Sequence, residues 1–269
     1  MYRLIACDLD ETLLNSAHVI PRRNLEAIRQ AAALGVRFVP ATGRGFCSVR
    51  TLLDAMGVRE KAGEYVISFN GGAVSENRGE RLLYLKAMPF SLAEELFRRG
   101  AEWDAGVRVY TRDTIYAYRV EEEERAYLAG RIDYQEFFRP DLDFLRGQEI
   151  IKVLYANRDR EFLNRLRREL SDLEDRLTIS FSSNRYMEFN PKGVDKGAGL
   201  TALAEALGVP MEETLAIGDN FNDLSMLQAA GLGACVKNAV PEVKAVCGYV
   251  SPDDNNQGAV AEIIERFVL

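Results

Sequence analysis

The stretch LIACDLDET, residues 4–12, places two carboxylates directly after a short apolar run. The apolar residues 4–7 predict a buried strand, and Asp8 and Asp10 follow at its carboxyl end. In open α/β sheets, ligands bind just outside the carboxyl ends of the strands. Two carboxylates in this position therefore indicate a metal site or a reaction.

A second acidic strand end occurs far along the chain. The apolar residues 214–217 lead into GDNFND, residues 218–223, which contains Asp219 and Asp223. The carboxyl ends of parallel strands meet at one edge of a sheet, so the two acidic segments can form one site. An EF-hand calcium loop is excluded, because Phe221 and Leu224 occupy positions that require a ligand and a glycine.

Strands and helices alternate in the first part of the chain. Residues 4–7, 36–39 and 65–69 predict strands, and apolar spacing predicts helices that end at Gly35 and Gly57. The same alternation returns after residues 190–193, with a helix over 200–207 and the strand 214–217. We therefore predict an α/β protein whose doubly wound, Rossmann-like parallel-sheet core comprises residues 1–82 and 190–269.

The segment between these two parts has a different pattern. Residues 107–111, 114–120 and 176–182 alternate in character, which is typical of a sheet with one packed face and one open face. Two apolar-periodic helices accompany these strands. Residues 83–189 are therefore predicted to form an inserted α+β cap domain.

The composition of the chain excludes several classes of protein. The chain has 269 residues, 47% of them apolar, and a formal net charge of −7, which argues against a nucleic-acid partner. No apolar stretch approaches the roughly 20 residues of a membrane span, and Asp8 and Asp10 interrupt any signal-peptide core. The four cysteines show no zinc or disulfide spacing. We expect a soluble cytoplasmic protein, with no prediction for its oligomeric state.

Four ordered motifs resemble those of the haloacid dehalogenase-like phosphatases, and within them the Cof-type sugar-phosphatase branch with a large α/β cap. The resemblance covers nearly the whole chain. More than 150 residues between the second and third motifs leave room for the cap at that point. The motifs are Asp8-x-Asp10-x-Thr12, Thr42-Gly43-Arg44, Lys196 and Gly218-Asp219-x-x-Asn222-Asp223.

The resemblance implies a mechanism and a metal. Asp8 would attack phosphorus to form an aspartyl-phosphate, and Asp10 would transfer protons to the leaving alcohol and from the attacking water. Mg²⁺ would be held by Asp8, by the backbone carbonyl of Asp10 and by Asp219, with Asp223 contacting its water ligands or Lys196. Such oxygen donors suit Mg²⁺.

The phosphoryl oxygens require donors, because carboxylates around a dianion would otherwise repel it. The expected phosphate-binding residues are Leu9, Thr42, Gly43, Lys196 and Asn222.

The choice of substrate is assigned to two places. One is the loop Asn70-Gly71-Gly72 after the third predicted core strand, and the other is the cap, where Glu188 is the main candidate. Further cap candidates are Arg119, Lys152 and Tyr186. The expected partner is a small phosphorylated sugar or cofactor.

Two other functions share part of this pattern. A phosphomannomutase-like phosphoryl transferase has the same motif order and cap position. A receiver-like, phosphorylation-controlled binding module also combines acidic residues, a threonine and a lysine on a doubly wound sheet. The Asp-x-Asp-x-Thr spacing and the large insert favour the phosphatase. Glu11 departs from the glycine most familiar at its position in the first motif.

Overall fold

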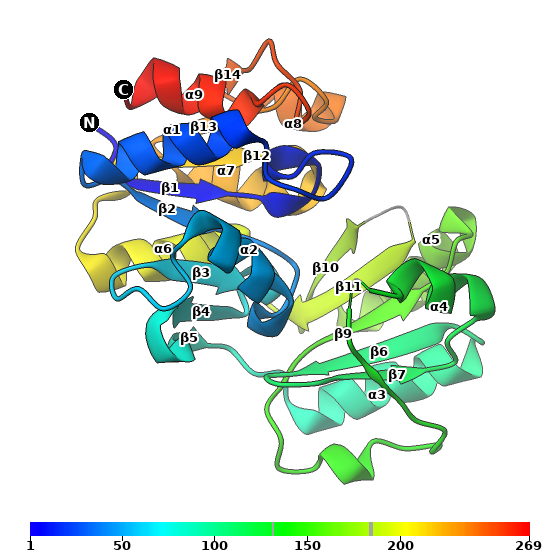
Figure 1. Ribbon diagram of the computed structural model, residues 1–269. Helices are drawn as coiled ribbons and strands as arrows, with labels where there is room; N and C mark the ends of the chain where they lie inside the picture. The colour runs from blue at the N-terminus through cyan, green and yellow to red at the C-terminus, as the bar shows by residue number, and fades with distance from the viewer. Residues whose placement is uncertain (131, 183–184) are drawn as a thin grey trace. The chain divides into compact units, whose positions relative to one another are not determined.

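The computed structural model describes residues 1–130, 132–182 and 185–269. The chain forms two compact units: a core unit, Met1–Tyr84 with Asp195–Leu269, and an insert unit, Leu85–Val194 (Figure 1). The expected boundaries lie after residues 82 and 189, whereas the units divide after residues 84 and 194. The core unit is therefore built from both ends of the chain.

The core unit contains a parallel sheet in which the first strand has a neighbour on each side. Its order is β14-β13-β12-β1-β2, so β1 lies between a strand near it in sequence and one about 200 residues away. This parallel core and the separate insert sheet confirm the predicted fold class. The strands are β1 (Leu4–Cys7), β2 (Arg37–Pro40), β12 (Thr214–Gly218), β13 (Leu232–Cys235) and β14 (Tyr249–Val250).

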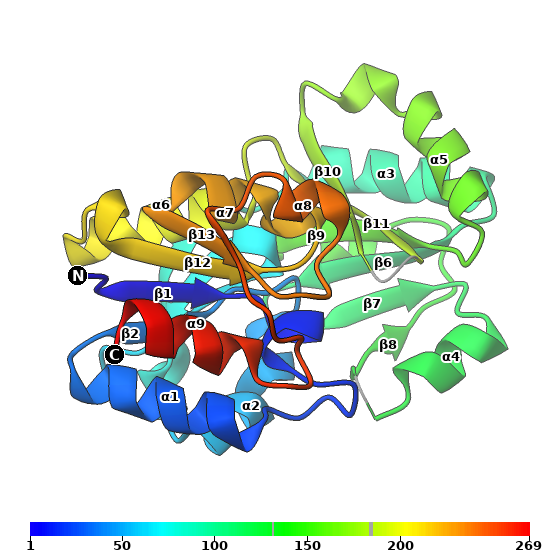
Figure 2. The same ribbon diagram turned by 90° about the horizontal axis from the view of Figure 1, so that it is seen from above.

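Helices cover both faces of this sheet, as the two views in Figures 1 and 2 show. Successive residues of β1 point to opposite faces. Ile5 and Cys7 pack in the cluster formed with α1 and α9, whereas Leu4 and Ala6 pack in the cluster formed with α6 and α7. The helices are α1 (Arg22–Ala33), α2 (Arg50–Met56), α6 (Lys196–Leu207), α7 (Leu224–Ala229), α8 (Pro241–Lys244) and α9 (Ala259–Phe267).

The third predicted core strand belongs to a second small sheet. Strand β3 (Tyr65–Ser68) pairs antiparallel with β4 (Ala73–Glu76), and β5 (Arg81–Leu85) completes the order β3-β4-β5. A single parallel bridge, Ala41 to Ile67, joins β3 to the end of β2. The predicted strand is therefore present and is joined in parallel to the end of β2, but the hairpin that it forms with β4 was not predicted, because the alternating pattern did not reveal the second strand.

The insert unit contains a six-stranded, mostly antiparallel sheet. Its order is β10-β11-β9-β6-β7-β8; β7 and β8 pair in parallel, and the other neighbouring strands pair antiparallel. Strands β8, β9 and β11 and helix α4 were not predicted. The elements are α3 (Phe90–Glu102), β6 (Gly106–Thr111), β7 (Ile115–Tyr118), α4 (Glu122–Leu128), β8 (Gln135–Glu136), β9 (Ile150–Ala156), α5 (Arg160–Glu169), β10 (Leu177–Ser182) and β11 (Tyr186–Pro191).

The two faces of the insert sheet differ in chemistry. Val107 and Val109 of β6 pack with α3 and α5 in one apolar cluster. Arg108 lies between them and points to the other face, where it pairs with Glu124 of α4. Lys152 and Glu188 form a second buried ion pair on neighbouring strands.

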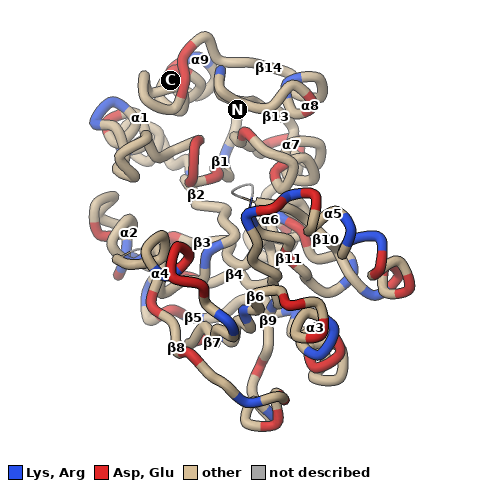
Figure 3. Tube along the Cα trace, turned by 90° about the vertical axis from the view of Figure 1, so that its right-hand side faces the viewer, with Lys and Arg blue, Asp and Glu red and all other residues tan. Residues whose placement is uncertain are grey.

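Basic and acidic residues both occur along the helices of the insert unit (Figure 3). Arg98 pairs with Glu102 along α3, Arg99 pairs with both Glu95 and Asp172, and on α5 Arg167 pairs with Glu174. These pairs bring charges of opposite sign together along both helices.

Short turns complete the two units. A π-type turn covers Leu9–Leu13, and single 3-10 turns cover Phe46–Val49, Phe69–Gly71, Arg78–Glu80, Asp143–Leu145, Ser171–Leu173, Met211–Glu213 and Phe221–Asp223. The helix predicted to end at Gly57 thus begins as a 3-10 turn. Among the described residues, no helix combines the length and apolar character needed to cross a membrane.

Gly71 lies where the β3–β4 turn packs against the start of α6. Its φ of +88° is in the left-handed region, and a Cβ there would lie 2.0 Å from the carbonyl oxygen of Asp195. A second glycine, Gly199, lies on the facing surface of α6, so two backbones approach each other without side chains. This contact positions the first turn of α6.

We expect Gly71→Ala to destabilise the protein strongly. A side chain in left-handed conformation costs about 1–2 kcal/mol, and the overlap with Asp195 adds roughly 1–3 kcal/mol. Gly63→Ala is the matched control, because Gly63 has φ +76° and a Cβ there would meet no other atom within 4 Å. Urea unfolding should show a larger loss for Gly71→Ala. Equal losses would contradict the close packing.

Candidate active site

The two acidic strand ends lie side by side in the core unit. Asp8 follows β1 and Asp219 follows β12, and the Asp8 N–H donates to the carbonyl of Ile217 at 2.9 Å. Carboxylate oxygens of Asp8, Asp219 and Asp223 lie within 4.8 Å of one another, and all three residues are buried. The parallel pairing of β1 with β12 is therefore what joins the first and fourth motifs.

The loop after β1 is tied to this cluster by Thr12. Its hydroxyl donates to Asp219 Oδ1 at 2.7 Å, a role that the sequence did not reveal. Glu11, one residue earlier, has φ +62°, the left-handed conformation that glycine adopts without strain. Its carbonyl accepts a hydrogen bond from Asn238 Nδ2 at 2.8 Å. Glu11 thus adopts the left-handed conformation that a glycine would adopt here, and Asn238, from outside the loop, binds its carbonyl.

Lys196 is the first residue of α6 and is completely buried. Its Nζ donates to Asp8 Oδ1 and, at 2.5 Å, to Asp223 Oδ1. Asp195 caps the helix by accepting from the Ala198 N–H. A Cβ on Gly197 would lie 2.6 Å from the Ser225 carbonyl, so glycine lets α6 approach α7 closely enough to bring the ammonium group to the carboxylates.

Asp223 connects the lysine to the fourth motif. While Oδ1 accepts from Lys196, Oδ2 accepts from the backbone N–H groups of Asp219 and Asn220, at 2.9 and 3.0 Å. Gly218 leaves space for this side chain, since a Cβ there would lie 2.6 Å from the Asp223 Cβ. Asp223 therefore holds the loop that carries Asp219.

Negative charge exceeds positive charge in this cluster. Burial, together with the neighbouring carboxylates, raises the pKa of Asp8 to about 7 and that of Asp219 to about 9. Burial alone would lower the pKa of Lys196, but Asp223 and Asp8 outweigh it and raise that pKa above its ordinary value. One ammonium group thus leaves part of the carboxylate charge uncompensated. A buried, all-oxygen donor set with excess negative charge fits Mg²⁺.

The second motif follows β2, directly beside β1. The Ala41 N–H donates to the Cys7 carbonyl at 2.8 Å, which places the buried Thr42 next to the end of β1. Asn70 lies against this segment: its N–H donates to the Thr42 carbonyl at 2.9 Å, and its Oδ1 accepts from Asn222 Nδ2 at 3.4 Å. A Cβ on Gly43 would lie 3.1 Å from the same Oδ1. Polar groups of two motif loops and of the loop Asn70–Gly72 thus gather at this edge.

Asp10 does not join the buried carboxylates. Its side chain is half exposed and forms an ion pair with Arg44, whose Nε donates to Asp10 Oδ2 at 3.0 Å. Arg44 belongs to the second motif, but we expected no specific role for it. The Leu9 side chain is buried in the apolar core, so only its backbone is available to a phosphate.

The other residues expected to select the substrate lie partly in the core unit and partly in the insert unit. Gly71 and Gly72 are buried in the turn after β3. In the insert unit, Glu188 pairs with Lys152 and accepts from the Ser182 hydroxyl. Tyr186 donates to Glu124 at 2.7 Å, and the exposed Arg119 pairs with Asp104.

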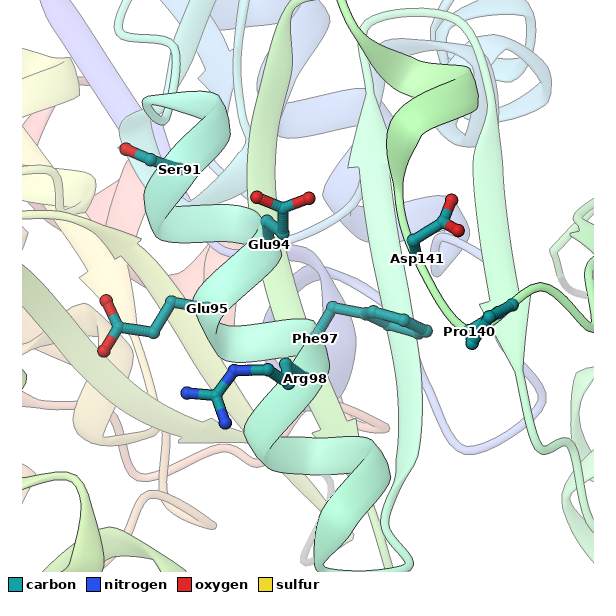
Figure 4. Close-up of a pocket in the computed structure, with 7 residues that line it drawn as sticks. All are labelled: Ser91, Glu94, Glu95, Phe97, Arg98, Pro140 and Asp141. Atoms are coloured by element: carbon teal, nitrogen blue, oxygen red, sulfur yellow. The ribbon is translucent and has the colours of Figure 1, made fainter.

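A pocket of about 390 Å³ lies on the insert unit between α3 and residues 140–141 (Figure 4). None of the motif residues lines it. Its arginine, Arg98, pairs with Glu102, and its other charged lining residues are acidic, so the lining does not favour a phosphate. The lining residues are Ser91, Glu94, Glu95, Phe97, Arg98, Pro140 and Asp141.

The charge imbalance predicts how stability depends on pH and metal. Because folding raises the pKa of Asp8 and Asp219, the metal-free folded state binds more protons than the unfolded state between about pH 4 and pH 9, so its stability falls as pH rises through this range. We expect the melting temperature of chelator-treated protein to fall from pH 5 to pH 8.5. Mg²⁺ should raise it more at pH 8.5, where it does not compete with protons.

Asp219→Asn provides the control for this experiment. It removes one carboxylate of the cluster and should flatten both the pH slope and the Mg²⁺ response. Each kcal/mol corresponds to roughly 2–4 °C for a domain of 150–250 residues, so the difference is measurable by calorimetry. A wild-type slope that persists unchanged in Asp219→Asn would show that other groups cause it.

Known proteins share this architecture along the whole chain. Residues 5–264 match the model of the haloacid dehalogenase-like hydrolase family. An HMP-PP phosphatase of Serratia proteamaculans is 30% identical, covering 100% of this chain and 96% of the relative. A 5-amino-6-(5-phospho-D-ribitylamino)uracil phosphatase of Bacillus subtilis is also 30% identical, covering 99% and 96%.

A solved structure agrees with these sequence matches. The crystal structure of a haloacid dehalogenase-like hydrolase from Bacteroides thetaiotaomicron is 29% identical, with a TM-score of 0.85 and 99% of each chain covered. The agreement extends over both the core unit and the insert unit. The chain therefore belongs to the haloacid dehalogenase-like hydrolases, which confirms the family and the phosphatase class of enzyme predicted from its motifs.

Proposed function

We propose that this protein is a Mg²⁺-dependent phosphatase that hydrolyses small phosphate monoesters through an aspartyl-phosphate on Asp8. The observation that carries the proposal is the position of Asp8, whose carboxylate accepts from a fully buried lysine beside two further acids. A carboxylate beside a fixed cation can receive a phosphoryl dianion that it would otherwise repel.

The proposed reaction has two steps. First, an Asp8 oxygen bonds to phosphorus, the bond from phosphorus to the ester oxygen breaks, and that oxygen takes a proton from the Asp10 carboxyl group. Second, a water oxygen bonds to phosphorus and gives a proton to Asp10, and the bond to Asp8 breaks to release phosphate. Each step is easier than a single displacement by water.

Residues of the core unit are assigned to the phosphoryl group and the metal. We assign the phosphoryl oxygens to Lys196, Thr42, Asn222 and the backbone of Leu9 and Gly43. Asp8, Asp219, Asp223 and the backbone carbonyl of Asp10 would hold Mg²⁺, directly or through its water ligands. When bound, Mg²⁺ would offset the excess negative charge and so strengthen binding of the dianionic ester.

Substrates of moderate size suit this assignment. The two relatives described above act on HMP-PP and on 5-amino-6-(5-phospho-D-ribitylamino)uracil, both small phosphorylated metabolites. We propose a sugar phosphate or a phosphorylated cofactor precursor here. The loop Asn70–Gly72 and Glu188 of the insert unit are proposed to contribute to the choice of leaving group.

Asp8→Asn should lower turnover of p-nitrophenyl phosphate by at least about 10³-fold, because an amide is not a nucleophile and the loss of a covalent catalyst is large. Phosphate release should be measured with Mg²⁺ and with excess chelator. Asp54→Asn is the matched control, since Asp54 is an exposed aspartate of the core unit that pairs with Arg59. Turnover that survives Asp8→Asn would exclude the proposed nucleophile.

The same preparation distinguishes the two other functions. A hexose 1-phosphate that yields the hexose 6-phosphate without free phosphate would indicate a mutase. A long-lived phosphorylated Asp8 with negligible turnover would indicate a receiver-like module. Stoichiometric release of phosphate and free alcohol, with each turnover dependent on Mg²⁺, is the expected result.

The ion pair between Lys152 and Glu188 permits a test of the insert unit. Glu188→Leu leaves a buried ammonium group without its carboxylate and should cost about 3–5 kcal/mol, whereas adding Lys152→Met should recover most of that loss. Stability is measured by urea unfolding. Substrate preference is measured as the ratio of kcat/KM values over a panel of phosphorylated sugars and cofactors.

The double variant separates the two roles of this pair. If Glu188 contributes to the choice of substrate, the stable double variant changes the order of preference within the panel. An unchanged order in a stable double variant would restrict the pair to a structural role. Hydrolysis of p-nitrophenyl phosphate serves as the internal reference in both cases.

A further inference from the structure

Both carboxylate oxygens of Asp10 are bound by one side chain. Arg44 Nε donates to Oδ2 at 3.0 Å, and Arg44 Nη2 donates to Oδ1. The pair lies at the surface of the core unit, with the two side chains 26% and 46% exposed. It links the loop after β1 to the loop after β2, and so joins the first motif to the second.

The backbone of Arg44 is held on both sides. Its N–H donates to the Thr42 hydroxyl at 3.1 Å, and its carbonyl accepts from the Phe69 N–H at 3.0 Å. The next residue, Gly45, packs so closely that a Cβ would lie 2.8 Å from the Phe69 ring. The guanidinium group therefore extends from a well-fixed segment that also carries Thr42.

Asp10 has few other constraints. Its backbone is extended, with φ −73° and ψ 127°, and it precedes the left-handed Glu11. The imidazole of His18 also lies near it, but its Nδ1 is 4.0 Å from Asp10 Oδ1, beyond hydrogen-bond distance. The terminal torsion of an aspartate is soft, so its plane is not set by its own chain. A planar guanidinium that donates to both oxygens does set that plane.

The pairing with Arg44 is compatible with proton transfer by Asp10. Two carboxylate oxygens offer about four lone-pair positions, and a bidentate guanidinium uses two of them. One position on each oxygen remains to hold a proton or to accept one from water. Arg44 can thus orient Asp10 without blocking its chemistry.

We infer that Arg44 is a positioning residue that holds the Asp10 carboxyl group toward the ester oxygen of the substrate, an inference that rests on the proposed function of Asp8 and Asp10. Arg44 acts through Asp10 and exchanges no proton itself. In the first step the phosphorus–oxygen bond breaks and the ester oxygen is protonated. The effect of Arg44 on the rate of this step should therefore be largest for esters whose leaving oxygen most needs that proton.

Leaving groups of different acidity separate this role from a structural one. Phenol is a weaker acid than p-nitrophenol, so phenyl phosphate depends more on protonation of its ester oxygen. The parameter kcat/KM reports the transition state relative to free enzyme and substrate, and therefore the first chemical step. A loss of folded protein would lower kcat/KM equally for both esters.

The experiment compares Arg44→Gln and Arg44→Lys with wild type on phenyl phosphate and p-nitrophenyl phosphate in Mg²⁺. General acid–base catalysis contributes typically 10²–10⁴-fold, so loss of its orientation should lower kcat/KM for phenyl phosphate by about tenfold or more. The loss for p-nitrophenyl phosphate should stay below about threefold. Arg44→Lys should resemble Arg44→Gln, because an ammonium group cannot bind both oxygens in one plane.

A double-mutant cycle with Asp10→Asn tests whether the two residues act together. Asp10→Asn should show the same selective loss, and Arg44→Gln should then reduce kcat/KM by less than about twofold further, because residues that act as a unit are not additive. Two control variants should leave the ratio between the esters unchanged. His18→Asn removes the imidazole near Asp10, and Arg23→Gln breaks a bidentate pair with Glu265 between α1 and α9.

The outcomes separate this inference from the proposed function. If wild type lacks Mg²⁺-dependent hydrolysis of both esters, the proposed function fails. If wild type is active, three results would each overturn the positioning role: full activity of Arg44→Lys, equal losses on both esters, or a loss in the Asp10→Asn background as large as in wild type. Melting temperatures of all variants verify that the compared proteins are folded.

Discussion

The ammonium group of Lys196 donates to two carboxylates in a place where water cannot reach it. A buried charge is tolerated only when it is paired and hydrogen-bonded, so this group requires Asp8 and Asp223 to be where they are. The three residues come from the end of β1, the start of α6 and the loop after β12. The pairing of these segments and the position of the lysine are thus mutually dependent.

The surrounding glycines serve this arrangement. Gly197 allows α6 to approach the start of α7, and Gly218 makes room for Asp223. Asp223 in turn holds two backbone N–H groups of its own loop, so the side chain that neutralises the lysine also shapes the segment that carries Asp219. Excess carboxylate charge remains after these contacts, which is the physical basis for expecting a divalent cation.

The surface of the site is organised by a different kind of contact. Asp10 lies outside the buried cluster and is bound by Arg44, on the loop that also carries Thr42. Charged contacts thus link the motifs at two depths, buried at Lys196 and partly exposed at Arg44. The buried contacts hold Asp8, the proposed nucleophile, in a preformed site, whereas the exposed pair can orient Asp10, which we propose protonates the leaving group.

The sequence by itself determined the family, the alternation of strands and helices in the core, and the acidic residues at the ends of β1 and β12. These features depend on local periodicity and on fixed spacing, both of which can be read along the chain. It did not distinguish the hairpin of β3 and β4 from a further parallel strand, because both begin with the same apolar run.

Only the tertiary structure decided which side chains meet. A lone lysine is usually exposed, yet Lys196 is buried, because glycine at position 197 allows two helices to pack closely. The contacts of Thr12 with Asp219 and of Arg44 with Asp10 join residues 207 and 34 positions apart. Such contacts depend on strand order and register, which bring distant strand ends to one edge of the sheet and leave no periodic signal in the sequence.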